Sequence, residues 1–278
     1  MIVIRADTLG FCGGVRRALR LAEQALAANP GGSFFSLGPL AHNPRLVEEL
    51  RARGITPVQE LSAVREGFLI VRTHGIGPAE RRECERPGVS IIDATCPTVR
   101  RIHEEVHAYS SQGFFVVVAG DPGHAEVKGI AAHARRVAVV ASREEAERVD
   151  FSGPVLLVVQ TTFDSGTYEE IRSVLVGRKP DIVVKETLCR EISEREHAVR
   201  RLALKVDALL VIGGRRSANT RRLYAAAAAS GRPCWQIEGA SDLPDGMSSF
   251  AKVGITAGAS TPDFVIEEVE GALRGLAG

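Results

Sequence analysis

Three of the five cysteines share one local context, which is suited to metal chemistry. Each follows an apolar, β-branched run and precedes an amphipathic run: VIRADTLGFCGGVRRAL around Cys12, SIIDATCPTVRRIH around Cys96 and IVVKETLCREISEREHAV around Cys189. A thiol at the start of a helix favours the thiolate, because the helix dipole and free backbone N–H groups stabilise negative charge. Three thiolates suit a soft metal centre, either zinc or an iron–sulfur cluster in which one iron has no protein ligand.

Polar residues recur at other predicted strand ends. A strand ends in glycine and a polar residue follows four positions later, which gives His42, His124 and Ser217. Further along each repeat, the motifs RTHG, QTT and TAGAS supply His74, Thr161 and Ser260. In parallel α/β sheets ligands bind beyond the carboxyl ends of the strands, so we expect these residues and the cysteines to converge on one cavity.

The chemistry of that cavity fits a small phosphorylated or diphosphorylated ligand. Histidines and hydroxyls, together with Asn219, donate hydrogen bonds without much fixed charge, and glycine-rich loops expose backbone N–H groups to phosphate. Glu126, two residues after His124, is the only loop carboxylate close to this set. We therefore expect Glu126 to donate or relay a proton.

The elements that must position these residues alternate between short apolar runs and amphipathic runs of helical length. A helix is predicted over Val15–Ala28, ended by the Asn-Pro-Gly-Gly that follows. Strands are predicted at Phe34–Leu37, Phe68–Val71, Val89–Ile92, Phe114–Ala119, Val137–Val140, Val155–Val159, Ile182–Val184, Ala208–Ile212 and Lys252–Thr256. This alternation predicts an α/β fold with small parallel sheets.

The cysteine motif repeats at a period of about 90 residues, which is longer than a solenoid repeat. We therefore expect three related βα units in a pseudo-threefold arrangement around a central cluster cavity. The expected units are residues 1–95 (Cys12, His42, His74), 96–186 (Cys96, His124, Glu126, Thr161) and 187–278 (Cys189, Ser217, Asn219, Ser260).

Composition excludes several classes of protein. The 278 residues are 45% hydrophobic and carry a net charge of +1 without a basic block, so neither nucleic acid nor an anionic membrane is an expected partner. No apolar run approaches the ~20 residues of a membrane span, and the N-terminus is strand-like rather than a signal peptide. The odd number of widely spaced cysteines argues against a disulfide framework. We expect a cytoplasmic monomer, with Cys84 and Cys234 outside the site.

The stretch His103-Glu-Glu-Val-His107 matches a zinc-protease motif, with two histidines four residues apart on a helix. A protease would need a third ligand and a cleft beside the helix. The helix already carries apolar residues at Val99, Ile102 and Val106, so the histidine pair is predicted to lie on its charged outer surface.

Taken in order along the whole chain, these motifs resemble a known family. GFCGGV, LGPLAHN, RTHG, DATCP, GHAEV, QTT, SAN and TAGAS are similar to the motifs of 4-hydroxy-3-methylbut-2-enyl diphosphate reductases, iron–sulfur enzymes of the methylerythritol phosphate route to isoprenoids. The resemblance implies one four-iron–four-sulfur cluster with three protein ligands, Cys12, Cys96 and Cys189. It also implies two-electron removal of a hydroxyl to give isopentenyl and dimethylallyl diphosphates, with electrons from a ferredoxin or flavodoxin.

The same resemblance implies roles for the other site residues. The diphosphate contacts would be His42, His74, Ser217, Asn219 and Ser260. His124 would lie near the substrate, Glu126 would deliver the proton, and Thr161 or its neighbour Thr162 would lie near the substrate hydroxyl.

Of three departures from the family pattern, the first is expected to change only backbone stiffness, and the other two bear on substrate affinity or identity. The usual His-Pro-Glu-Val reads His124-Ala-Glu-Val, and the usual Ser-Ser-Asn reads Ser217-Ala-Asn, which removes one hydroxyl. After the third cysteine, the usual Thr-x-x-Arg-Gln keeps Arg195 but has Ile192 and Glu196 in place of Thr and Gln.

Three alternatives to this reductase remain open. One is an iron–sulfur lyase that dehydrates its substrate without net reduction, as quinolinate synthase does. Another is a paralogous reductase with a different substrate. The last is a non-enzymatic iron–sulfur or zinc protein, which would not need a diphosphate cradle.

Overall fold

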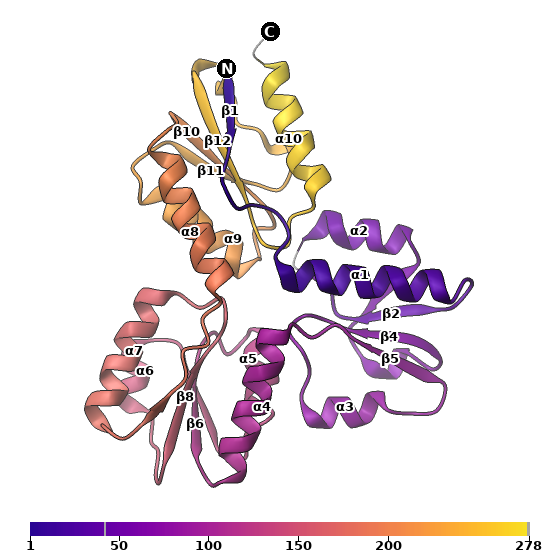
Figure 1. Cartoon of the computed structure of the whole chain (residues 1–278), viewed down its shortest axis with the longest axis vertical. Helices are drawn as coiled ribbons and strands as arrows, with labels where there is room; N and C mark the ends of the chain where they lie inside the picture. The colour runs from indigo at the N-terminus through magenta and orange to yellow at the C-terminus, as the bar shows by residue number, and fades with distance from the viewer. Residues whose placement is uncertain (42, 277–278) are drawn as a thin grey trace. The chain divides into compact units, whose positions relative to one another are not determined.

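A computed structural model describes residues 1–41 and 43–276, in which twelve strands form three four-stranded parallel sheets (Figure 1). One sheet has the order β1-β12-β10-β11, the second β3-β2-β4-β5 and the third β7-β6-β8-β9. The strands are β1 (Ile2–Arg5), β2 (Phe34–Leu37), β3 (Ile55–Val58), β4 (Gly67–Val71), β5 (Val89–Asp93), β6 (Phe115–Ala119), β7 (Val137–Val140), β8 (Val155–Val159), β9 (Val183–Val184), β10 (Ala208–Ile212), β11 (Cys234–Ile237) and β12 (Lys252–Ala257).

Helices alternate with these strands, as predicted for an α/β fold. They are α1 (Gly13–Ala28), α2 (Pro44–Ala52), α3 (Pro78–Cys84), α4 (Pro97–Ser111), α5 (Ala125–Ala131), α6 (Arg143–Arg148), α7 (Ser165–Arg178), α8 (Arg190–Ala203), α9 (Ala218–Ala228) and α10 (Asp263–Gly275). Polar side chains cap several of them: Asn43 at α2, Ser142 at α6, Asp164 at α7 and Ser217 at α9. None of the described helices is both long enough and apolar enough to cross a membrane.

The described chain divides into two compact units. One comprises Met1–Arg16, Ala41–Ile55 and Arg190–Gly278 and contains the β1-β12-β10-β11 sheet. The other comprises Arg17–Leu40 and Thr56–Cys189 and contains the remaining two sheets, apart from the first residue of β3.

The N-terminal strand pairs with a strand from the far end of the sequence. Ile2 lies opposite Lys252, and Arg5 opposite Ile255, in a parallel ladder between β1 and β12. This sheet therefore combines the first residues of the chain with strands from the predicted third unit. The unit boundaries at 95/96 and 186/187 remain a prediction.

The central strands carry apolar residues on both faces, so helices pack on both faces of the sheet. Every residue of β8 and β10 is buried. Alternate residues of β10 face opposite ways, so that Leu209 packs with α8 and α9 while Leu210 packs with α10. Figure 1 shows α8 and α9 on one side of this sheet and α10 on the other. In the β6-β8 sheet, α6 and α7 cover one face and α4 and α5 the other. This burial on two sides is typical of parallel sheets.

The predicted strands are all present, with ends that differ by at most one residue. The strand β3 was missed because its sequence, ITPV, contains Pro57, which cannot donate to a strand ladder. The structure tolerates this proline because β3 lies at the edge of its sheet.

Candidate active site

Each of the three predicted cysteine ligands directly precedes a helix, as the sequence predicts. Cys12 precedes α1, Cys96 precedes α4 with Pro97 as the first helical residue, and Cys189 precedes α8. The Cys12 Sγ accepts a hydrogen bond from the backbone N–H of Val15 at 3.4 Å. All three thiols are partly exposed. A helix N-terminus attracts negative charge through its dipole and free N–H groups, and the thiolate is the form of cysteine that binds metal.

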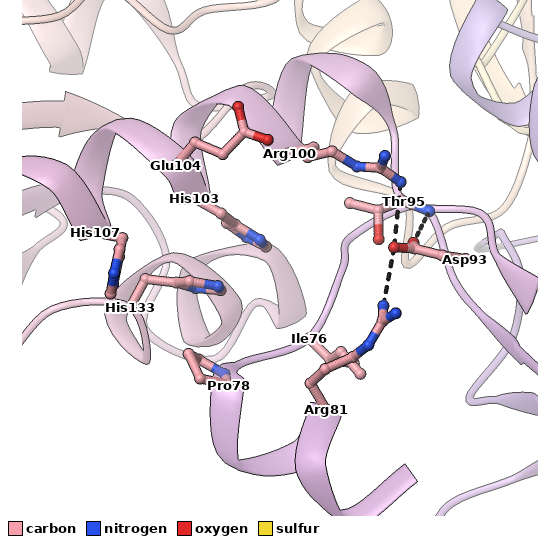
Figure 2. A pocket seen from close by; sticks show the side chains of 10 residues that line it. All are labelled: Ile76, Pro78, Arg81, Asp93, Thr95, Arg100, His103, Glu104, His107 and His133. Carbon is pink, nitrogen blue, oxygen red and sulfur yellow. Dashed lines mark hydrogen bonds and ion pairs between the residues drawn. The ribbon is translucent and has the colours of Figure 1, made fainter. Parts of the chain in front are cut away.

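The Cys96 loop is fixed by the aspartate that precedes it. Asp93 accepts a hydrogen bond from the backbone N–H of Thr95 at 3.0 Å and forms ion pairs with Arg81 at 3.1 Å and Arg100 at 3.2 Å (dashed lines in Figure 2). Burial raises the pKa of Asp93, but the Thr95 hydrogen bonds and the arginines outweigh it and hold the pKa below its usual value. The Cys96 N–H then donates to the Thr73 carbonyl at 3.0 Å. Asp93, whose charged form these contacts favour, thus fixes the turn that presents the thiol.

The Cys189 loop is tied to a buried carboxylic acid through Thr161. The Cys189 N–H donates to the Thr161 carbonyl at 2.9 Å. Thr161 in turn donates twice to Glu126, from its backbone N–H at 2.6 Å and from its hydroxyl at 2.8 Å. One threonine therefore holds both a predicted metal ligand and the predicted proton donor.

Glu126 is a buried carboxyl group whose pKa lies above its usual value. Only 2% of the surface of Glu126 is exposed. Burial raises its pKa, and the two hydrogen bonds from Thr161 oppose that rise only in part. A carboxyl group with a raised pKa is suited to donate a proton near neutral pH.

The predicted histidine His124 lies beside Glu126 at the start of α5, and His74 packs against His124. His124 is the N-cap of α5, and its Nδ1 accepts the Glu126 backbone N–H at 3.2 Å, so the proton of the neutral ring is on Nε2. The rings of His74 and His124 meet edge to face with centroids 5.2 Å apart. The structure thus groups His74, His124, Glu126 and Thr161; His42 lies outside the described residues.

In the other unit, Ser217, Asn219 and Ser260 occupy the ends of neighbouring strands. Ser217 caps α9 after β10, and Ser260 follows β12, which pairs with β10. The Asn219 residue is only 5% exposed, and within the described ranges neither its Oδ1 nor its Nδ2 has a hydrogen-bond partner. Buried amides are normally paired, so this side chain is available to a polar ligand such as a phosphate group.

The strand ends in this unit approach one another closely because two glycines leave room. A Cβ on Gly258 would lie 2.2 Å from the Thr220 hydroxyl oxygen. Gly213 has a φ of +146°, and a Cβ there would lie 2.7 Å from the Thr261 hydroxyl oxygen. The loops after β10 and β12 are therefore packed directly around the start of α9, which positions Ser217, Asn219 and Ser260 together.

Two acidic residues after Cys189, Glu191 and the unusual Glu196, form contacts with distant parts of their unit. Glu191 accepts the Gly13 N–H with both oxygens, at 3.1 and 3.2 Å, and pairs with the almost fully buried Arg195 at 3.3 Å. Glu196 pairs with Arg222 of α9. The i, i+4 spacing of Glu191 and Arg195 was a readable signal in the sequence, whereas the Glu196–Arg222 pair depends on the packing of α8 against α9.

The structure corrects the prediction for the histidine pair of α4. His107 is exposed, but His103 is buried, with 6% of its surface exposed. The outer-surface assignment of His103 is wrong because α4 packs against α5 on that side. Cys84, predicted to lie outside the site, is a core residue of the β2-β4 sheet.

The three predicted cysteine ligands suit a thiolate-bound metal centre by their chemistry rather than by a grouping already present among the described residues. Within residues 1–41 and 43–276, no three His, Cys, Asp or Glu side chains are grouped to hold a metal ion. Cys12 belongs to one compact unit, and Cys96 and Cys189 to the other. The fit therefore rests on the chemistry of three partly exposed thiols at helix N-termini, two of which are fixed by the backbone bonds described above.

Comparison with known proteins decides the family. A protein-family model described as LytB protein matches residues 3–274. The chain belongs to the LytB family. A 4-hydroxy-3-methylbut-2-enyl diphosphate reductase of Treponema denticola is 40% identical over 97% of this chain and 98% of that protein. Another, from Geotalea uraniireducens, is 38% identical over 97% of this chain and 95% of that protein.

Solved structures support the same assignment within the LytB family. The E-1-hydroxy-2-methyl-but-2-enyl-4-diphosphate reductase of Plasmodium falciparum matches with a TM-score of 0.91 and 25% identity, over 100% of this chain and 88% of that one. A second structure, of (E)-4-hydroxy-3-methyl-but-2-enyl diphosphate reductase, the terminal enzyme of the non-mevalonate pathway, has a TM-score of 0.77 and 35% identity over 99% of this chain and 100% of that one. The α/β fold with three small parallel sheets is thereby confirmed.

Proposed function

We propose that the chain reduces 4-hydroxy-3-methylbut-2-enyl diphosphate to isopentenyl and dimethylallyl diphosphates. Two electrons and two protons convert the substrate C–OH into C–H and water. Membership of the LytB family gives the reaction class, since the relatives carry this activity in their names. The observation that carries the proposal in this chain is the buried Glu126, held by Thr161 next to the Cys189 loop.

A four-iron–four-sulfur cluster is the proposed cofactor, held by Cys12, Cys96 and Cys189. When bound, it would supply electrons and, at an iron without a protein ligand, a Lewis acid for the substrate oxygen. The pseudo-threefold arrangement of the units 1–95, 96–186 and 187–278 around that cluster is part of the proposal.

The remaining site residues would bind and protonate the substrate. We assign the diphosphate to Ser217, Asn219 and Ser260 together with His42 and His74. The unpartnered, buried amide of Asn219 supports this assignment, because a bound diphosphate would satisfy its N–H groups.

Glu126 would protonate the leaving hydroxyl so that it departs as water. Its raised pKa and its burial support this role. The Thr161 hydroxyl donates to this carboxyl, and His124 accepts the Glu126 backbone N–H; both would help to orient the substrate hydroxyl toward Glu126. A ferredoxin or flavodoxin electron donor, a monomeric state and a cytoplasmic location complete the proposal.

The first experiment tests the cofactor. Anaerobically purified protein should be brown and contain about four irons per chain, as a cubane cluster requires. Cys96→Ser should lower the iron content sharply, whereas Cys234→Ser, a cysteine outside the site, should not. A colourless protein with one zinc would refute both the reductase and the iron–sulfur lyase.

The second experiment tests the reaction. Reduced viologen should be oxidised only when the hydroxylated diphosphate is added. Glu126→Gln should keep the wild-type iron content and lose turnover by about a hundredfold or more, as expected when a general acid is removed. Cluster-loaded protein that leaves viologen reduced would favour the lyase or a different substrate, and full turnover by Glu126→Gln would remove the acid assignment.

A further inference from the structure

The two histidines of α4 line a cavity of about 500 Å³ within the unit that contains Thr56–Cys189 (Figure 2). His107 is at the exposed side, and His103 is buried against the protein. His133, just beyond α5, completes a group of three imidazoles in this cavity. None of these three residues has a role in the proposed reaction, so the burial of His103 needs its own explanation.

The His103 ring fills the space where two site-bearing segments meet. A Cβ on Gly75 would lie 2.6 Å from His103 Cε1, and a Cβ on Gly129 would lie 3.3 Å from His103 Nε2 and 3.4 Å from the His74 carbonyl oxygen. Gly75 directly follows His74, and Gly129 belongs to α5, whose N-cap is His124 and whose first turn contains Glu126. The ring is therefore wedged between the His74 loop and the helix that carries the proposed acid.

His133 connects the His103 ring to α5. The rings of His103 and His133 stack with centroids 4.2 Å apart and planes 23° apart. His133 Nδ1 lies 2.8 Å from the Gly129 carbonyl oxygen; since a carbonyl only accepts, Nδ1 is the donor. The stack thus joins α4 to the C-terminal end of α5, opposite the end that holds His124.

The His103 ring is neutral near neutral pH. Burial and the neighbouring His133 lower the pKa of His103 to about 3, against a small opposite effect of Asp93. The other charged groups that line the cavity are Arg81, Arg100 and Glu104, and the two arginines are both paired with Asp93. A neutral ring can pack tightly against α5 without an unpaired buried charge.

We propose that His103 is a positioning residue for the reaction, which sets the placement of α5, and so of Glu126, against the loop that carries His74. The inference rests on the proposed function of Glu126. His103 does not touch the substrate; it acts through the helix. Removal of the ring leaves α5 free to settle toward α4 and moves the carboxyl away from its working position.

The variants are chosen to separate positioning from general stability. His103→Ala removes the wedge, and His107→Ala is the matched control: the same residue type, on the same helix, in the same cavity, but exposed. Gly129→Ala tests the contact from the other side, because its Cβ would lie 3.3 Å from His103 Nε2, close enough that the ring must shift by a few tenths of an ångström. Gly177→Ala is its control, a helix glycine with nothing within 4 Å of an added Cβ.

We expect His103→Ala to lower kcat about tenfold at unchanged iron content and His107→Ala to leave kcat unchanged. In the Glu126→Gln background His103→Ala should lower the residual kcat less than about twofold, because both changes act on one step. Gly129→Ala should lower kcat without lowering Tm, since alanine is the better helix former, while Gly177→Ala leaves kcat unchanged. If His103→Ala does not fold, Gly129→Ala still tests whether the His103 contact positions α5.

A measurement independent of turnover completes the test. Hydrogen–deuterium exchange of the α5 amides in the cluster-loaded protein should be several-fold faster in His103→Ala and unchanged in His107→Ala. Equal kcat losses in the wild-type and Glu126→Gln backgrounds, full activity of His103→Ala or of Gly129→Ala, or unaltered α5 exchange would overturn the proposal. A wild-type protein without turnover would instead refute the proposed function, and the exchange data would still report whether His103 holds α5.

Discussion

Acidification should destabilise the chain through His103. The pKa of this buried imidazole is about 3 in the folded protein, against 6.5 for an ordinary histidine. Between pH 6.5 and about pH 3, His103 binds a proton in the unfolded chain but not in the folded one. The free energy of unfolding therefore falls as the pH falls, and the stability that the neutral ring contributes is fully present only above pH 6.5. The linkage relation with these two pKa values gives a loss of about 2 kcal/mol between pH 7.5 and pH 5.

The measurement compares two proteins, because other groups titrate in the same range. His133, whose pKa is also lowered by burial, contributes in the same direction to both. Anaerobic urea unfolding at pH 7.5 and pH 5 should show that the stability gap between wild type and His103→Gln shrinks by about 2 kcal/mol at the lower pH. His107→Gln, at an exposed position, should follow the wild-type pH dependence.

One result would refute this reasoning. If wild type and His103→Gln lose stability in parallel, to within about 0.5 kcal/mol, then the ring is not held neutral by the fold. The tight contacts with Gly75 and Gly129 would then have to relax enough to admit a charged, hydrated imidazole.

Three further outcomes follow from contacts in the two units. Thr161→Val removes the hydroxyl that donates to Glu126 and should lower the free energy of unfolding by about 1–3 kcal/mol. Because the lost hydrogen bond lowers the pKa of Glu126, the basic limb of the pH–kcat profile should move to higher pH, and Thr161→Ser should restore both properties. Glu196→Ala leaves the largely buried Arg222 without this carboxylate and should lower the urea-derived unfolding free energy by about 3 kcal/mol, more than Glu196→Gln does. Gly213→Ala strains a backbone with φ +146° against two threonine hydroxyls and should weaken pyrophosphate binding in calorimetry, at unchanged iron content.

The sequence was sufficient for the local elements. Apolar β-branched runs predicted the core strands, because a strand buried on both faces needs such residues at every position. The position of each cysteine between a strand and a helix was also readable, because it depends only on neighbouring residues. The charged acid before Cys96 was visible too, but its role in fixing the Thr95 turn was not.

Tertiary structure decided the features that depend on partners distant in sequence. Periodicity gives no signal for the pairing of β1 with β12, since a parallel ladder can join any two strands. The burial of His103 was missed because α4 taken alone presents this residue beside charged neighbours, and only the contact with α5 covers it. In the same way the sequence determined that Glu126 and Thr161 are present, whereas the fold buries Glu126, which raises its pKa, and brings Thr161 across 35 residues to donate hydrogen bonds to it.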